Sequence, residues 1–145
     1  MTAYTVDTSV HINALNASEP GSQDSQAFLE YLERENHEMV CPTLLIPETA
    51  AALARAFEDS EKSLAFALSI STLPHMTLVA LDEPLSITAA ELAARHRLRG
   101  ADAVYAAVAQ RHQTTLVTHD RKQLERLSGV LPVMRPAQAL AQERE

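Results

Sequence analysis

Short apolar runs alternate with longer amphipathic stretches along most of the chain. Runs rich in β-branched residues predict strands, because such side chains pack well on a pleated surface. Apolar residues spaced three or four apart predict helices, as where Phe28, Leu29 and Leu32 share one face. The predicted strands are 3–6, 38–41, 76–81, 114–118 and 131–134, and the predicted helices are 9–15, 23–36, 42–57, 62–71, 82–97, 101–112 and 121–127.

This alternation predicts an α/β fold with three layers, in which helices cover both faces of a central, mainly parallel sheet. We expect a single domain over residues 1–135, followed by a C-terminal tail or frayed helix at 136–145. Pro47 is expected to kink or restart the helix at 42–57. Ligands of such sheets bind beyond the carboxyl ends of the strands, so chemistry is expected there.

Composition narrows the class of protein further. The 145 residues, 46% hydrophobic and 21% charged, suit one soluble globular domain. We find neither an apolar run long enough to cross a bilayer nor a secretory signal peptide, and therefore expect no membrane association. The lone Cys41 excludes an internal disulfide and a multi-thiolate zinc site, and it favours a reducing, cytoplasmic location. Three glycines exclude a Gly-rich phosphate loop.

The net charge of −7 is unevenly distributed. Residues 1–94 hold 3 basic and 14 acidic residues, which gives −11, whereas residues 95–145 hold 9 basic and 5 acidic residues, which gives +4. An acidic protein binds nucleic acid poorly through overall charge. A nucleic-acid partner would therefore require a local basic patch or bound cations.

Four carboxylates stand at predicted strand ends or helix starts. Asp7 and Asp120 follow strands, while Glu48 and Asp102 lie near the starts of helices made largely of small residues. Each alone has an ordinary interpretation as a helix cap or a first-turn charge, and we interpret Asp82 in that way.

Taken together, the four acids are expected to converge at one edge of the sheet. Nothing in folding favours such a cluster, because like charges repel and raise one another's pKa. A cation would relieve the repulsion, and ligands that are all oxygens favour Mg²⁺ or Mn²⁺ over zinc.

The segments around these acids resemble the motifs of PIN-domain nucleases, most closely the VapC-type toxins of bacterial toxin–antitoxin pairs. The similar segments are Val-Asp-Thr-Ser-Val (6–10), Leu-Leu-Ile-Pro-Glu-Thr-Ala (44–50), Leu-Arg-Gly-Ala-Asp-Ala-Val-Tyr-Ala-Ala (98–107) and Thr-Leu-Val-Thr-His-Asp (115–120). Each motif alone is weak, but four in order over residues 5–133 form a specific signal.

The resemblance implies an acidic metal site for Mg²⁺ or Mn²⁺ that consists of Asp7, Glu48, Asp102 and Asp120, supported by the hydroxyls of Ser9 and Thr118. It also implies a metal-dependent endoribonuclease that hydrolyses RNA phosphodiester bonds and leaves a 5′-phosphate and a 3′-hydroxyl. Such an enzyme would be the toxin of a type II toxin–antitoxin pair, with a cognate antitoxin and a second copy of the chain as partners.

Basic residues flank the third and fourth motifs. We expect them to contact the RNA backbone, although a solvated helix face explains them equally well. These residues are Arg95, Arg97, Arg99, Arg121, Lys122 and Arg126. The sequence leaves open whether His119, beside Asp120, points into the site or away from it, and a surface side chain is the ordinary expectation.

Two other functions deserve comparison. A phosphatase or phosphotransferase would use a strand-end aspartate as nucleophile, but Asp7-Thr8-Ser9 lacks a second aspartate and no lysine occupies a comparable strand end. A catalytically inactive PIN-like module that binds RNA or protein is the stronger alternative. The presence of all four acids argues against it, and acid-to-amide substitutions distinguish the two.

Overall fold

A parallel five-stranded sheet forms the centre of the computed structural model, which describes all residues from Met1 to Glu145. The strands are β1 (Tyr4–Val6), β2 (Met39–Pro42), β3 (Met76–Val79), β4 (Thr115–Val117) and β5 (Val133–Met134). The helices are α1 (Thr8–Leu15), α2 (Ser22–Arg34), α3 (Leu45–Phe57), α4 (Ser60–Ser71), α5 (Glu83–His96), α6 (Gly100–His112), α7 (Arg121–Leu127) and α8 (Pro136–Glu143).

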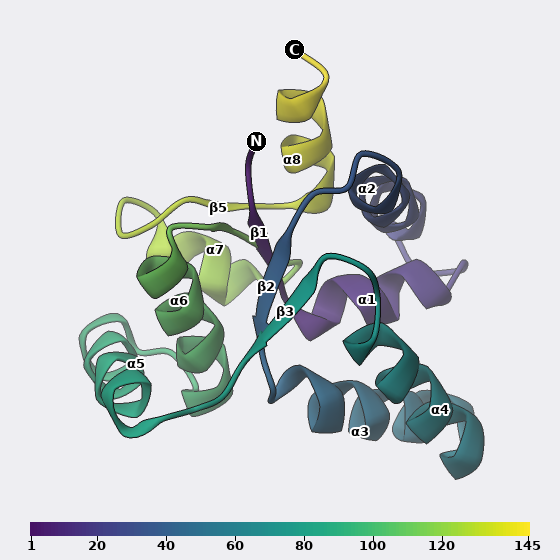
Figure 1. The fold of residues 1–145 in the computed structure, drawn as a ribbon, viewed down its shortest axis with the longest axis horizontal. Coiled ribbons are helices and arrows are strands. Elements are labelled where there is room, and N and C mark those ends of the chain that lie inside the picture. Colours follow the sequence, from purple (N-terminus) through teal and green to yellow (C-terminus); the bar gives the residue numbers. More distant parts are fainter.

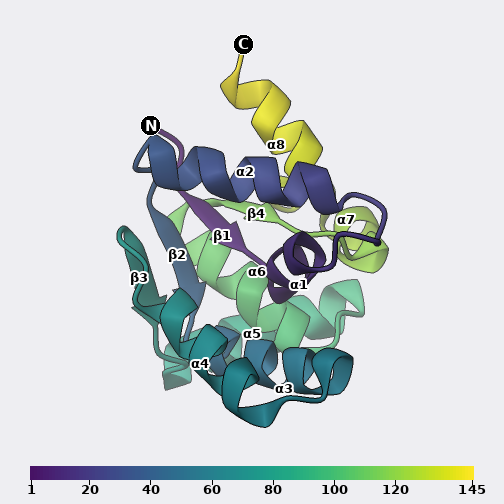
Figure 2. The same ribbon diagram turned by 90° about the vertical axis from the view of Figure 1, so that its right-hand side faces the viewer.

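Helices cover both faces of this sheet. Figure 1 shows α5, α6 and α7 on one side and α1, α2 and α4 on the other, while α3 extends from the lower end of β2. Turned by 90°, the view shows α1, α2 and the α3–α4 pair in front of the strands (Figure 2). The predicted three-layer α/β/α fold is therefore confirmed.

The strand order places the carboxyl end of β1 at the topological switch point, where the order of the strands reverses between β1 and β4. The order is β3-β2-β1-β4-β5, so the chain builds the sheet outward from β1 on one side and then returns to build it on the other. In open parallel sheets, the crevice at such a switch point is where ligands bind. Val6 pairs with Val117, and the next residues along the two strands, Asp7 and Thr118, therefore leave the sheet side by side.

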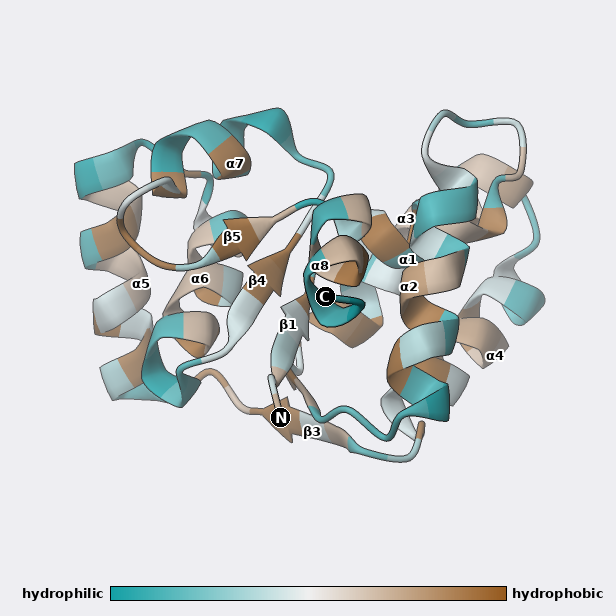
Figure 3. Cartoon of the chain, turned by 90° about the horizontal axis from the view of Figure 1, so that it is seen from above, coloured by the Kyte–Doolittle hydropathy of each residue, from teal (hydrophilic) through white to brown (hydrophobic).

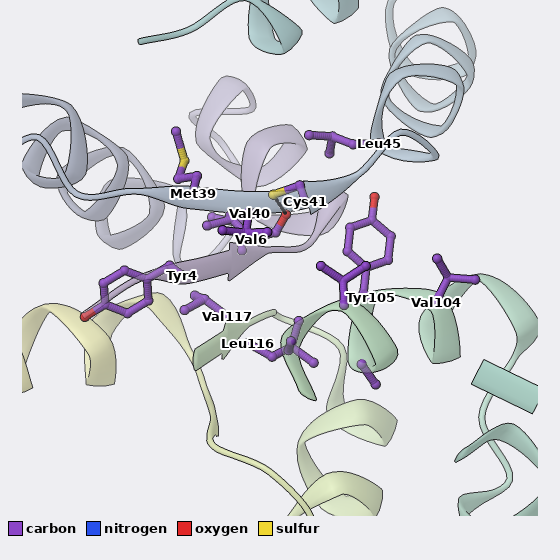
Figure 4. Packing of buried hydrophobic residues seen from close by; sticks show 14 of the residues in the cluster. Tyr4, Val6, Met39, Val40, Cys41, Leu45, Val104, Tyr105, Leu116 and Val117 are labelled. Carbon is purple, nitrogen blue, oxygen red and sulfur yellow. Dashed lines mark hydrogen bonds between the residues drawn. The ribbon is translucent and has the colours of Figure 1, made fainter. Parts of the chain in front are cut away.

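The core lies between the sheet and its helices. The α6 residues from Ala103 to Ala109 are all buried, and their mostly small side chains let this helix lie close to the strands. On the other face the Tyr4 ring meets Phe28 edge to face, with 5.2 Å between the ring centroids. Figure 3 shows apolar colour on β4 and β5 against hydrophilic stretches of α7, and Figure 4 shows the strands and α6 packed through their buried side chains.

Helix boundaries follow local chemistry. Pro47 lies in the first turn of α3, where a missing N–H costs no intrahelical bond, and the helix therefore starts at Leu45 rather than at residue 42. Asp82 caps α5 by accepting a hydrogen bond from the Leu85 amide at 2.8 Å, as expected. None of the helices combines the length and the apolar character needed to cross a membrane.

The C-terminal segment, for which we expected a tail or a frayed helix, forms the ordered helix α8. Ala139 and Leu140 are buried against the core, and α8 packs on α2. Glu143 also accepts a hydrogen bond from the Tyr4 hydroxyl and lies 3.5 Å from His37 Nε2. The sequence pattern is short and rich in alanine and glutamine, which explains why it did not stand out.

The packing of α8 predicts a stability contribution that a tail would not make. Leu140→Ala should lower the free energy of unfolding by about 2–3 kcal/mol, because it removes a buried side chain. Gln142→Ala, an exposed change on the same helix, should stay within about 0.5 kcal/mol of wild type. Urea unfolding measures both; equal effects would show that α8 does not stabilise the fold.

Candidate active site

Asp7 is the most deeply buried of the four acids. It directly follows β1, its side chain is only 6% exposed, and its amide continues the sheet by donating to the Val117 carbonyl at 2.9 Å. The carboxylate does not cap α1, although Asp7 occupies the N-cap position. Instead its Oδ2 accepts hydrogen bonds from Ser9 Oγ at 2.7 Å and Thr118 Oγ1 at 3.0 Å.

The hydroxyls of Ser9 and Thr118 connect Asp7 to the loop after β4. While donating to Asp7, Ser9 accepts from the amide of His119 at 3.1 Å, and Thr118 accepts from the amide of Asp120 at 3.0 Å. Each hydroxyl thus serves as donor and acceptor at once. The strand ends of β1 and β4 are therefore held in one arrangement, with both supporting hydroxyls next to the acids.

Glu48, in the first turn of α3, is bonded to a pair of hydroxyls beside Asp7. Thr8 Oγ1 donates to Glu48 Oε1 at 3.3 Å and lies 2.8 Å from the Tyr105 hydroxyl, so Tyr105 acts as the donor to Thr8. The Tyr105 ring projects from α6 toward the side of the sheet where Cys41 and Leu45 lie (Figure 4). Residues from α1, α3 and α6 thereby meet beside the Glu48 carboxylate.

Asp102 and Asp120 share a partner on α7. Gln123 donates its side-chain amide to Asp102 Oδ1 at 3.2 Å, and its backbone amide to Asp120 Oδ1 at 3.2 Å. Asp120 Oδ1 also accepts from the Lys122 amide at 2.8 Å, so Asp120 caps α7 while it faces the site. Gln123 is 1% exposed, and its Oε1 atom has no hydrogen-bond partner.

Burial and the charges of neighbouring acids raise the pKa of three of the four carboxyls, Asp7, Glu48 and Asp102. Burial raises the pKa of Asp7, and the charge of Asp120 raises it further. The hydrogen bonds from Ser9 and Thr118 lower this pKa but do not cancel the effect of burial. Burial also raises the pKa of Glu48 and of Asp102, each of which feels the charge of Asp7. These couplings show that the four acids share one electrostatic environment.

The donors present fit a divalent cation of the Mg²⁺ or Mn²⁺ type. All four acids offer only oxygen atoms as ligands, they repel one another, and the orphaned Gln123 Oε1 is a further buried oxygen next to Asp102. No three His, Cys, Asp or Glu side chains are already arranged as a coordination shell. The carboxylates instead turn toward hydroxyl, amide and guanidinium donors of the protein.

Among the basic residues expected to contact RNA, only Arg99 reaches the acids. It lies 3.1 Å from both Asp102 Oδ2 and Asp120 Oδ2. Arg121 pairs with Glu125, and Arg126 donates to the Arg97 carbonyl. Arg95, Arg97 and Lys122 are exposed and form no ion pair with an acid, as expected for side chains that are free to meet a ligand or solvent.

His119 is half-buried, not the surface side chain that we expected. Its Nε2 lies 2.6 Å from Ser25 Oγ, which in turn donates to Asn13 Oδ1 at 2.7 Å, so the histidine is the donor to Ser25. The pKa of His119 is lowered by burial and by the nearby charge of Arg135. Gly21 has φ +84° and packs so closely that a Cβ would meet His119 Cε1 at 3.3 Å. His119 therefore anchors the loop after β4 from behind.

Sequence reasoning missed three contributors to the site, namely Thr8, Tyr105 and Gln123. Tyr105 lies three residues after Asp102, and Gln123 lies three residues after Asp120, so each shares a helix face with an acid. That spacing was the only available signal. Thr8 is part of the first motif but offers no signal of its own, because its role depends on where α3 and α6 pack.

Comparison with known proteins identifies the family. Residues 4–130 match the PIN domain, and the chain therefore belongs to the PIN domain family, as its four acidic motifs suggested. This membership places it among nucleases. No curated protein matches the chain.

Solved structures with a similar fold include proteins described as a toxin or as a toxin–antitoxin complex. A toxin–antitoxin complex from Klebsiella pneumoniae matches with a TM-score of 0.66 and 18% identity, over 93% of this chain and 98% of the other. FitAcB from Neisseria gonorrhoeae gives 0.70 and 22%, over 92% and 97%. VapC20 of Mycobacterium tuberculosis, described as a toxin that cleaves the sarcin–ricin loop, gives 0.72 and 17%, over 85% and 94%.

Because Asp7 is buried, we predict that its charged carboxylate lowers the folding stability of the metal-free protein. Because the folded pKa of Asp7 is raised, the folded state keeps a proton that the unfolded state has released, and stability falls as pH rises above the ordinary aspartate pKa. Asp7→Asn should therefore stabilise the metal-free protein at neutral pH by about 1 kcal/mol, or a few degrees in melting temperature.

Thermal melts in EDTA, at about pH 7.5 and about pH 4.5, check the sign of this effect. The gain from Asp7→Asn should be larger at the higher pH, where the wild-type carboxylate is charged. Asp24→Asn, at an exposed carboxylate in the first turn of α2, is the matched control and should change little. A destabilising Asp7→Asn at neutral pH would contradict this account of the site.

Proposed function

We propose that the protein is a metal-dependent endoribonuclease and the toxin of a type II toxin–antitoxin pair. The observation that carries this proposal is the placement of the acids around the switch point of a PIN-domain sheet. Thr118 joins Asp7 to the Asp120 amide, and Gln123 bonds both Asp120 and Asp102. Glu48 accepts from Thr8, the residue next to Asp7. A phosphodiester is negatively charged, and bare carboxylates would repel it. A bound cation reverses that relation.

The four carboxylates are the residues that would hold Mg²⁺ or Mn²⁺. When bound, such an ion supplies activated water and neutralises charge that develops on the phosphodiester. Asp7 and Glu48, the partners of the hydroxyl network, would stay fixed by Ser9, Thr118 and Thr8 as the ion enters. Gln123 would keep Asp102 and Asp120 oriented from the α7 side. The products would carry a 5′-phosphate and a 3′-hydroxyl.

Basic residues at the rim support a nucleic-acid substrate, for which we propose RNA. Arg97 is the C-cap residue of α5, just before the helix that carries Asp102, and Lys122 lies in the first turn of α7, which Asp120 caps. Both side chains are exposed, and neither is engaged in an ion pair. Such side chains suit contacts to the phosphate backbone, which position a nucleic acid without reading its sequence.

An exposed apolar groove supports a protein partner. Leu15, Leu53, Phe57 and Phe66 line a depression among α1, α3 and α4, and the Phe57 side chain is 52% exposed. Exposed apolar surface of this kind marks interaction sites on soluble domains. Together with the likeness to toxins solved in toxin–antitoxin complexes, it supports a cognate antitoxin, and a homodimer is the proposed resting assembly.

Cleavage of RNA by purified protein tests the enzymatic proposal. Wild type should cleave a mixed RNA substrate with Mg²⁺ or Mn²⁺, and EDTA should abolish cleavage. Asp7→Asn, Glu48→Gln, Asp102→Asn and Asp120→Asn should each lose activity by about 100-fold or more, since each removes a proposed ligand. Asp24→Asn should retain wild-type activity.

The same variants distinguish a nuclease from an inactive binding module. Induced expression in bacteria should arrest growth for wild type and Asp24→Asn but not for the acid-to-amide variants. If wild type binds RNA without cleaving it under any of these metal conditions, the binding module is the correct function. If growth arrest persists in all four variants, hydrolysis is not its cause.

A further inference from the structure

Arg99 joins two of the four acids with one guanidinium group. It is the N-cap residue of α6, one turn before Asp102 on the same helix. Its Nε donates to Asp102 Oδ2 and its Nη2 donates to Asp120 Oδ2, both at 3.1 Å. A single positive group thus spans carboxylates that come from different elements of the fold.

The choice of oxygen atoms is informative. The Oδ1 atoms of Asp102 and Asp120 accept from Gln123, which is buried and fixed in α7. The Oδ2 atoms accept only from Arg99. The protein therefore commits one oxygen of each acid to a rigid neighbour and leaves the other to the guanidinium. These two Oδ2 atoms are the ones available to a cation at this site.

Arg99 is held at the site by little else. Its side chain is 76% exposed, whereas those of Asp102 and Asp120 are 14% and 20% exposed, so the guanidinium covers the two acids from the solvent side. Exposed ion pairs of this kind are weak, because water and salt screen them and a long side chain must be ordered. Arg99 can leave without disturbing the core, and a divalent ion brings twice its charge.

We propose that Arg99 holds the place of the divalent cation between Asp102 and Asp120 in the metal-free protein and is displaced when the metal binds. The proposal rests on the metal site of the proposed function. It assigns Arg99 a role different from that of the other rim residues: a positioning residue that keeps two like charges together until the ion arrives. The metal affinity of the protein is lower than that of the bare acids, because the ion must first compete with Arg99.

Calorimetric titration with Mn²⁺ alone, without RNA, tests the competition. Arg99→Gln removes the bridge between the two acids. The matched control is Arg97→Gln, which removes the same positive charge two residues earlier in the chain, from a side chain that bridges no acids. Arg99→Gln should bind Mn²⁺ about three- to tenfold more tightly than Arg97→Gln, the fold-change expected for the loss of two exposed ion pairs. In EDTA, Arg99→Gln should melt at a lower temperature than Arg97→Gln, because the metal-free protein then lacks the bridge. The substitution is thus expected to strengthen metal binding while it lowers the stability of the metal-free protein.

A spectroscopic measurement follows the displacement directly. In ¹⁵N-labelled protein, the Arg99 Nε–H resonance, assigned by its absence in Arg99→Gln, should move toward the position of free arginine as Mg²⁺ is added. The same addition should leave this resonance unchanged in Asp7→Asn if that substitution removes metal binding. An Arg99 resonance that stays fixed while wild type binds Mg²⁺ would overturn the displacement.

The outcomes separate this inference from the proposed function. Equal Mn²⁺ affinities for Arg99→Gln and Arg97→Gln, or weaker binding by Arg99→Gln, overturn the place-holder role and leave the metal site standing. Absence of Mn²⁺ binding in wild type and both variants overturns the metal site itself, and the place-holder role with it.

Discussion

The arrangement of this site depends on the repulsion among carboxylates at one edge of the sheet, which the surrounding residues must offset. Asp7, Glu48, Asp102 and Asp120 come from four separate elements, and burial raises the pKa of the first three, so that their charges cost more than they would in water. The fold opposes that cost with a fixed set of donors. Hydroxyls serve Asp7 and Glu48, an amide side chain serves Asp102, and helix-terminal N–H groups serve Asp120.

These donors also divide the site into a rigid part and a replaceable part. The bonds from Ser9, Thr118 and Gln123 come from side chains tied to the sheet or buried in α7. The bonds from Arg99 come from a side chain that is mostly in solvent. Such a division preorganises the acids before any ion or substrate is present, which is what precise placement of a reacting group requires.

The fold was largely predictable because its signals are local. Apolar runs marked every strand, helix-capping residues such as Asp82 and Asp120 marked helix starts, and the strand–helix alternation set the parallel topology. Helix α8 escaped because its stability comes from packing on α2 rather than from its own pattern. Its buried Leu140 has meaning only once α2 is in place.

The sequence pointed to the acids of the candidate site but not to their surroundings. Four motifs in order led to these carboxylates, since each motif is contiguous in sequence. The partners Thr8, Tyr105 and Gln123, and the inward turn of His119 beneath Gly21, depend on which elements pack together. The bridge from Arg99 depends on side-chain geometry alone, and the charge pattern suggested only an RNA contact.

The bond between Thr118 and Asp7 joins residues 111 positions apart, and it closes the two central strands at their carboxyl ends. During synthesis, Asp7 therefore leaves the ribosome long before Thr118 has been made. Because β4 must be made and paired with β1 before Asp120 can approach Asp7, a truncated or nascent chain has the first acids without a site. The order of synthesis thus delays the assembly of the candidate site until the fold is nearly complete.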